Sequence, residues 1–118
     1  MSTRTELLTS LLNFDQPLRQ ITSTLATFGW DSNRSLVVLN QNHIAMVLTR
    51  YLNGELSEVD VEGWANAIEG REDITYKDDI GDELNDVIYQ LANPLLTVPM
   101  SETFAKALLK QLSEGAIV

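Results

Sequence analysis

The feature that most constrains the fold of this chain is a helical spacing of apolar residues that recurs along most of its length. The clearest case is the set Ile44, Val47, Leu48, Tyr51 and Leu52, which falls at positions i, i+3, i+4, i+7 and i+8. Residues with this spacing share one face of a helix. Similar stripes in the other segments complete the pattern, which predicts helices near residues 4–13, 16–28, 41–53, 58–69, 79–92 and 102–113.

Residues that start and stop helices stand at the ends of these segments. An N-cap side chain accepts a hydrogen bond from the first turn of a helix, and the expected N-caps are Thr3, Asp15, Asn40, Ser57 and Ser101. Glycine, asparagine and proline commonly follow a helix, and the expected stops are Gly29, Asn53-Gly54, Gly70, Asn93-Pro94 and Gly115. The caps therefore support the helix boundaries independently of the apolar stripes.

One apolar segment lacks helical spacing. Residues 35–39, SLVVL, are rich in β-branched side chains, which favours a short strand or an extended buried connector, and we expect an extended segment at 36–39. A single strand cannot form a sheet, and residues 71–77 resemble a polar connector. The chain has 118 residues, of which 44% are hydrophobic, and this is enough for one domain with its own core. We predict an all-α fold, a compact bundle of about six short amphipathic helices in a single domain, residues 1–118.

Composition excludes several classes of function. The absence of cysteine rules out disulfides, thiolate metal sites and thiol nucleophiles. The formal charge of −9 repels nucleic-acid phosphates and anionic membranes, so we expect a basic protein as partner and neither nucleic acid nor membrane. No apolar run approaches the roughly 20 residues that span a bilayer, and the N-terminus lacks the apolar core of a signal peptide. The expected location is the cytoplasm.

Acidic residues concentrate in the stretch REDITYKDDIGDELND, residues 71–86. On a helix beginning at residue 79, Asp79, Asp82, Glu83 and Asp86 share a face that lies away from the apolar stripe. Acids in a first turn gain about 0.3–1 kcal/mol from the helix dipole, which favours a solvated helix start. Like charges four residues apart destabilise a helix by about a few tenths of a kcal/mol per pair. Helix stability alone therefore does not explain all of these acids, and a role in binding stays open. The residues that would bind a basic partner are Glu72, Asp73, Asp78, Asp79, Asp82, Glu83 and Asp86.

A metal site is the third interpretation of these acids. The motifs ELSE (Glu55, Glu58) and ELND (Glu83, Asp86) form two carboxylate pairs that could hold Mg²⁺ against a triphosphate. The sequence DELNDVIYQLA is similar to the second metal helix of the all-α nucleotide pyrophosphatases. In that family the first motif lies within a helix, whereas here Glu55 follows Asn53-Gly54. We therefore expect no cofactor and keep the pyrophosphatase as the alternative.

Histidine and tryptophan offer few candidates for chemistry. His43 is the only histidine, and without cysteine or a second histidine it cannot anchor a familiar transition-metal site, so we expect a surface or capping role. Trp64 lies on the apolar stripe of the helix at 58–69 and belongs to the predicted core. Trp30 follows Gly29 and could either pack in a loop or anchor an interface.

No pairing of a nucleophile with a base is apparent. No nucleophile motif, such as G-x-S-x-G, surrounds Ser10, Ser32, Ser35 or Ser57. Arg71, within the acidic stretch, is expected to pair with Glu69 or Glu72 rather than to hold a substrate. We therefore predict that the chain is not an enzyme and has no catalytic residues.

The segments VLTRYLNGELSEVDVEGWANAIEGREDI and LANPLLT carry a family resemblance, over roughly residues 44–97. They are similar to small bacterial helical proteins of the colicin D immunity group, in which a helix, a turn of the form G-E-[IL]-S and a second acidic helix recur. The resemblance implies a cognate inhibitor that covers the cationic active site of a toxin, such as a nuclease, with carboxylates. An orphan helical interaction domain is the other alternative.

Overall fold

Side-chain caps start four of the helices in the computed structural model, which describes residues 3–27, 37–69, 71 and 73–115. The capped helices are α1 (Arg4–Asn13) at Thr3, α3 (Gln41–Leu52) at Asn40, α4 (Glu58–Ile68) at Ser57 and α6 (Glu102–Gly115) at Ser101. In each case the cap side chain accepts a hydrogen bond from a backbone amide of the first turn, as predicted. These four starts are confirmed.

Helix α2 (Leu18–Ala26) begins differently from the prediction. Pro17 occupies its N-cap position without a side-chain hydrogen bond, so the predicted cap at Asp15 is wrong. The amide of Asp15 instead donates to the carbonyl of Ser10 at 3.3 Å and closes the end of α1, where Phe14 adopts a left-handed φ of 47°. At its other end α2 stops at Ala26, and the predicted stop at Gly29 lies outside the described residues.

The helix predicted from residue 79 is divided into two pieces. A 3₁₀ turn, η1 (Asp78–Ile80), precedes α5 (Gly81–Ala92), and Ile80 between them has a φ of −133° that interrupts the helix. The prediction that Asp79 shares a helical face with Asp82 is therefore wrong, because Asp79 lies on the separate turn. Helix α5 ends before Asn93-Pro94, as predicted.

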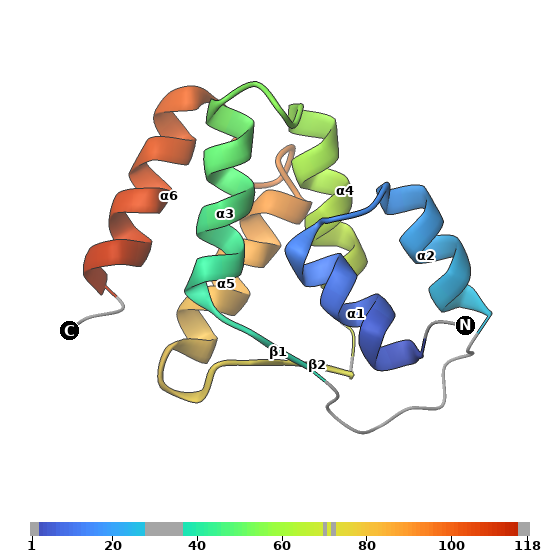
Figure 1. The fold of residues 1–118 in the computed structure, drawn as a ribbon. Helices are drawn as coiled ribbons and strands as arrows, with labels where there is room; N and C mark the ends of the chain where they lie inside the picture. Colours follow the sequence, from blue (N-terminus) through green and yellow to red (C-terminus); the bar gives the residue numbers. More distant parts are fainter. Residues whose placement is uncertain (1–2, 28–36, 70, 72, 116–118) are drawn as a thin grey trace.

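The extended segment is confirmed at residues 37–39, while residue 36 lies outside the described residues, and the segment has a strand partner that the sequence did not indicate. Strands β1 (Val37–Leu39) and β2 (Ile74–Tyr76) pair in parallel, with Val37 opposite Ile74 and Leu39 opposite Tyr76. They cross one end of the helical assembly (Figure 1). The interpretation of residues 71–77 as a connector is wrong, because β2 lies within them. A strand of three residues is too short to show the alternation of apolar and polar residues that identifies a strand in a sequence.

The helices enclose one core, and the fold is mainly all-α as predicted. Helix α4 packs against α5, α3 against α6, and α1 against α2 (Figure 1). Trp64 of α4 is completely buried at the centre, and its indole Nε1 donates to the carbonyl of Leu11 in α1 at 2.7 Å. This bond satisfies the one polar atom of the indole and fixes α4 against α1. The prediction of Trp64 as a core residue is confirmed.

Candidate partner-binding surfaces

The first candidate is the acidic surface, defined here as Asp78, Asp79, Asp82, Glu83 and Asp86. All five residues are exposed, on η1 and on the solvent side of α5. The opposite side of α5 buries Leu84, Val87 and Ile88, which fixes the direction of the acids. Lys77 Nζ lies 3.5 Å from Asp79 Oδ1, and this is the one ion pair of the acidic surface within the described residues. The arrangement favours a cationic partner by charge.

Asp73 does not belong to this surface, and its predicted role in partner binding is wrong. Its side chain is buried, with the residue 4% exposed, and its two carboxylate oxygens accept from Arg71 Nε at 2.9 Å and Nη2 at 3.1 Å. Arg4 Nε of α1 lies 3.4 Å from the same carboxylate. Asp73 therefore ties the entry of β2 to the start of α1. Arg71 therefore pairs with Asp73 and not with Glu69, whereas the predicted alternative, Glu72, lies outside the described residues.

The alternative metal ligands Glu55, Glu58, Glu83 and Asp86 do not form a site. Across the described ranges, no group of three or more His, Asp or Glu residues is placed to hold a metal ion. Glu55 lies in the α3–α4 connection, where its carboxylate accepts from Arg50 Nε at 3.2 Å. Glu58 begins α4, whereas the other two acids lie on α5. Glu55 follows the helix break at Asn53-Gly54, where Gly54 has a φ of 82°, and precedes the Ser57 cap, so the first pair does not lie within one helix.

His43 and the described serines have structural roles. The Nδ1 atom of His43 accepts from the amide of Asn40 at 3.1 Å, which completes a reciprocal cap and confirms the predicted capping role. Burial lowers the pKa of His43 below its ordinary value. Ser57 caps α4, and Ser10 accepts from Gln16 Nε2 at 3.3 Å. Trp30, Ser32 and Ser35 lie outside the described residues.

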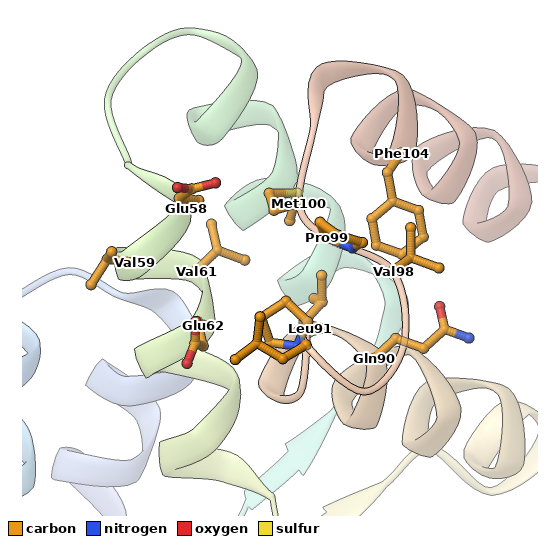
Figure 2. A pocket seen from close by; sticks show the side chains of 12 residues that line it. Glu58, Val59, Val61, Glu62, Gln90, Leu91, Val98, Pro99, Met100 and Phe104 are labelled. Atoms are coloured by element: carbon orange, nitrogen blue, oxygen red, sulfur yellow. The ribbon is translucent and has the colours of Figure 1, made fainter.

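The second candidate is an apolar groove that the sequence reasoning missed. It lies between α4, the end of α5, the connection 93–101 and the first turn of α6, and Figure 2 shows side chains from these segments facing a common space. Its volume is about 320 Å³, at the lower end of the range of roughly 300–1,000 Å³ found for ligand sites. The residues that line it are Glu58, Val59, Val61, Glu62, Gln90, Leu91, Pro94, Leu95, Val98, Pro99, Met100 and Phe104.

The groove has a buried apolar floor and an exposed apolar rim. Val61 and Leu91 form part of the floor and are buried in the core. On the rim, Leu95 is 96% exposed, Val59 is 71% exposed and Val98 is 44% exposed. A cluster of exposed apolar side chains around a hollow is typical of a binding site, whereas a single exposed leucine is not informative.

Hydrogen bonds hold the rim in place. After α5, the amides of Leu96 and Thr97 both donate to the carbonyl of Asn93 at 3.0 Å, and the Thr97 hydroxyl donates to the carbonyl of Gln90 at 3.0 Å. The turn that carries Leu95 is thus bonded to the last turn of α5. A possible sequence signal was the apolar run PLLTVP, residues 94–99, which has no helical spacing and connects two helices.

The two surfaces are neighbours along α5. Asp86 belongs to the acidic surface, and Gln90, one turn further, lines the groove. Residues four apart on a helix lie on the same side, about 6 Å apart along the axis. A partner that covers α5 from Asp86 to its C-terminal end can therefore contact the acidic surface and the groove together.

Comparison of the chain with protein-family models, with curated proteins and with solved structures finds no match. Within the part of the chain that the structure describes, none of the helices has the length and apolar character needed to cross a membrane.

Proposed function

We propose that this chain is a non-catalytic binding protein whose partner is a basic protein. The most specific form of the proposal is an immunity-like protein that neutralises a basic toxin, such as a nuclease, by covering its cationic active site. The observation that carries the proposal is the acidic surface, whose five carboxylates are exposed together on η1 and α5. Of these, Asp79 alone has an ion-pair partner among the described residues.

The total charge supports the same conclusion. A formal charge of −9 on 118 residues attracts a basic protein over several ångströms and raises its association rate by roughly 10–10³ at low ionic strength. The attraction weakens as the Debye length falls from about 10 Å at 0.1 M salt to about 3 Å at 1 M. Asp82 and Asp86 are the expected centre of the contact. Asp86 lies beyond the first turn of α5, where the helix dipole no longer stabilises an acid, and Asp82 lies four residues before it on the same side of the helix.

The test is capture of the partner by the immobilised protein, with Asp82→Asn/Asp86→Asn as the variant. We expect the wild type to retain a basic protein at about 0.15 M salt and to capture it more slowly and bind it more weakly as salt rises. The double variant should bind it more weakly, by about 2–5 kcal/mol if the acids form buried pairs at the contact. Binding constants measured by calorimetry on the purified pair give the comparison.

A matched control removes the same charge elsewhere. Asp15→Asn/Glu55→Gln also changes two exposed carboxylates, neither of which lies on η1 or α5. This control should retain most of the affinity, and far-UV circular dichroism should show that both variants keep their helices. Full affinity of Asp82→Asn/Asp86→Asn for the captured partner would identify the acidic surface as a solvated helix start, and the proposal would fail.

A further inference from the structure

We infer that the apolar groove receives an amphipathic segment of a basic protein partner, with large apolar side chains entering the groove and a lysine or arginine contacting Glu58 and Glu62. This deepens the proposed function and rests on it, because the occupant belongs to the same basic partner. It adds a contact that the charge of the chain alone does not imply.

Shape and composition indicate an apolar occupant. The floor is made by core residues Val61 and Leu91, so the hollow is continuous with the folded core. Phe104 and Met100 are half-buried on one side of the groove (Figure 2). Val59 and Leu95 also line the groove and are exposed. An apolar helix face that binds in such a groove removes these side chains from water, and this burial stabilises the complex.

Charge decides which apolar occupant fits. Glu58 and Glu62 are one turn apart on α4, and both line the groove. Neither has an ion pair within the described part of the chain. The groove therefore offers two uncompensated carboxylates beside apolar surface, which complements a segment that carries both leucine-like and basic side chains.

The same charges disfavour other occupants. Two copies of this chain would each bring a formal charge of −9, and their Glu58 and Glu62 side chains would repel, so self-association through the groove is opposed. An anionic lipid surface is repelled for the same reason. A cationic peptide segment is attracted both by the groove and by the acidic surface that adjoins it on α5.

Synthetic peptides test the inference without the natural partner. Three short helices are compared: one with a leucine face and lysines, one with the same lysines but serine in place of leucine, and one with the leucine face and glutamates. The protein is labelled at its methionine methyl groups for NMR, because Met100 lines the groove and Met46 of α3 does not. We expect the Met100 signal to shift saturably with the leucine–lysine peptide, while the Met46 signal stays in place.

Substitutions on the exposed rim avoid loss of folding. Val59→Ser/Leu95→Ser should weaken binding of the leucine–lysine peptide about tenfold or more. Val38→Ser is the matched control, because Val38 is also exposed, at 51%, but lies on β1 outside the groove. Glu58→Gln/Glu62→Gln should reduce the preference for the lysine peptide over the glutamate peptide. The inference is overturned if the serine–lysine peptide binds as tightly as the leucine–lysine one, or if the rim variant binds like Val38→Ser.

Two further outcomes separate this inference from the proposed function. If Asp82→Asn/Asp86→Asn weakens peptide binding while Val59→Ser/Leu95→Ser does not, the peptide binds to the acidic surface alone, and the groove inference fails while the proposed function stands. Conversely, retention of peptide binding in that variant supports the groove as an independent contact. Sedimentation velocity tests the remaining occupant, since a concentration-dependent dimer abolished by Val59→Ser/Leu95→Ser would assign the groove to a second copy and overturn the inference.

Discussion

Asp73 shows at the scale of single residues why an acid in an acidic stretch can have a purely structural role. It lies next to the acids of η1 in the sequence, yet its carboxylate is buried between Arg71 and Arg4. A buried carboxylate that keeps its charge needs such partners, because removal from water is otherwise costly. The two guanidinium groups meet this requirement and connect β2 to α1.

Asp73→Asn should therefore destabilise the protein substantially. The neutral amide cannot compensate the charges of two guanidinium groups, and we expect a loss of about 2–4 kcal/mol in the free energy of unfolding. This loss is smaller than the largest values for fully buried ion pairs, because both arginine side chains are partly exposed. Urea denaturation measures the loss. Asp79→Asn is the control, since it removes an exposed pair with Lys77 that is worth about 0–1 kcal/mol. Equal losses in the two variants would contradict this account.

His43 should make stability depend on pH. Burial lowers its pKa in the folded protein below the unfolded value of 6.5, so the unfolded chain binds more protons at mildly acidic pH. The stabilising contribution is therefore complete above the unfolded pKa and is lost as pH falls through the folded pKa. Protonation of Nδ1 would also remove the acceptor for the amide of Asn40.

The check compares wild type with His43→Gln between about pH 7.5 and about pH 5.5, by urea denaturation. Glutamine at this position can still accept from the N-cap amide but does not titrate. We expect the wild type to lose more stability than the variant over this range. A wild-type protein that gains stability on acidification relative to His43→Gln would disprove the assignment.

At the scale of elements, the packing of α2 on α4 depends on Gly63. A Cβ atom at this position would lie 2.9 Å from Cδ2 of Leu18, so the glycine allows the two helices to approach closely. Glycine within a helix costs roughly 0.8–1.0 kcal/mol relative to alanine, so its presence in α4 needs such a reason. The nearest atom is the end of a flexible side chain that is only partly buried.

Alanine and leucine at position 63 should consequently behave differently. Gly63→Ala should stay within about 1 kcal/mol of the wild type, because the gain in helix propensity offsets a small shift of Leu18. Gly63→Leu should lose about 1–3 kcal/mol by overpacking. Thermal unfolding gives the ranking, and Leu18→Ala added to Gly63→Leu should recover part of the loss. If Leu18→Ala lowers the stability of Gly63→Leu by as much as it lowers the stability of the wild type, the contact between α2 and α4 is not the cause of the loss in Gly63→Leu.

At the scale of the whole molecule, the acidic surface and the apolar groove lie next to each other because both use α5. Its N-terminal half carries Asp82, Glu83 and Asp86, and its C-terminal half contributes Gln90 and Leu91 to the groove. Salt weakens contacts between charges but leaves apolar contacts largely intact. A partner that uses both surfaces should therefore associate in a salt-sensitive way and then be held by contacts that resist salt.

Most helix boundaries and the all-α class could be predicted from the amino-acid sequence. Caps such as Ser57 with Asp60, and stripes such as Ile44, Val47 and Leu48, act between residues three or four apart, so they can be recognised locally. The start of α2 was missed because the left-handed turn at Phe14 has no glycine to mark it. The acidic surface was largely anticipated for the same local reason, since Asp82, Glu83 and Asp86 face away from an apolar stripe.

The positions of the surfaces relative to one another could not be predicted from the sequence and depend on the fold. The pairing of β1 with β2, the burial of Asp73 against Arg4, and the groove between Val59 and Leu95 all join residues more than thirty positions apart. Such contacts depend on how the helices pack, and helix packing follows from the shapes of buried side chains rather than from a pattern in one segment. The charge of the candidate site was therefore visible in the sequence, whereas its apolar part required the fold.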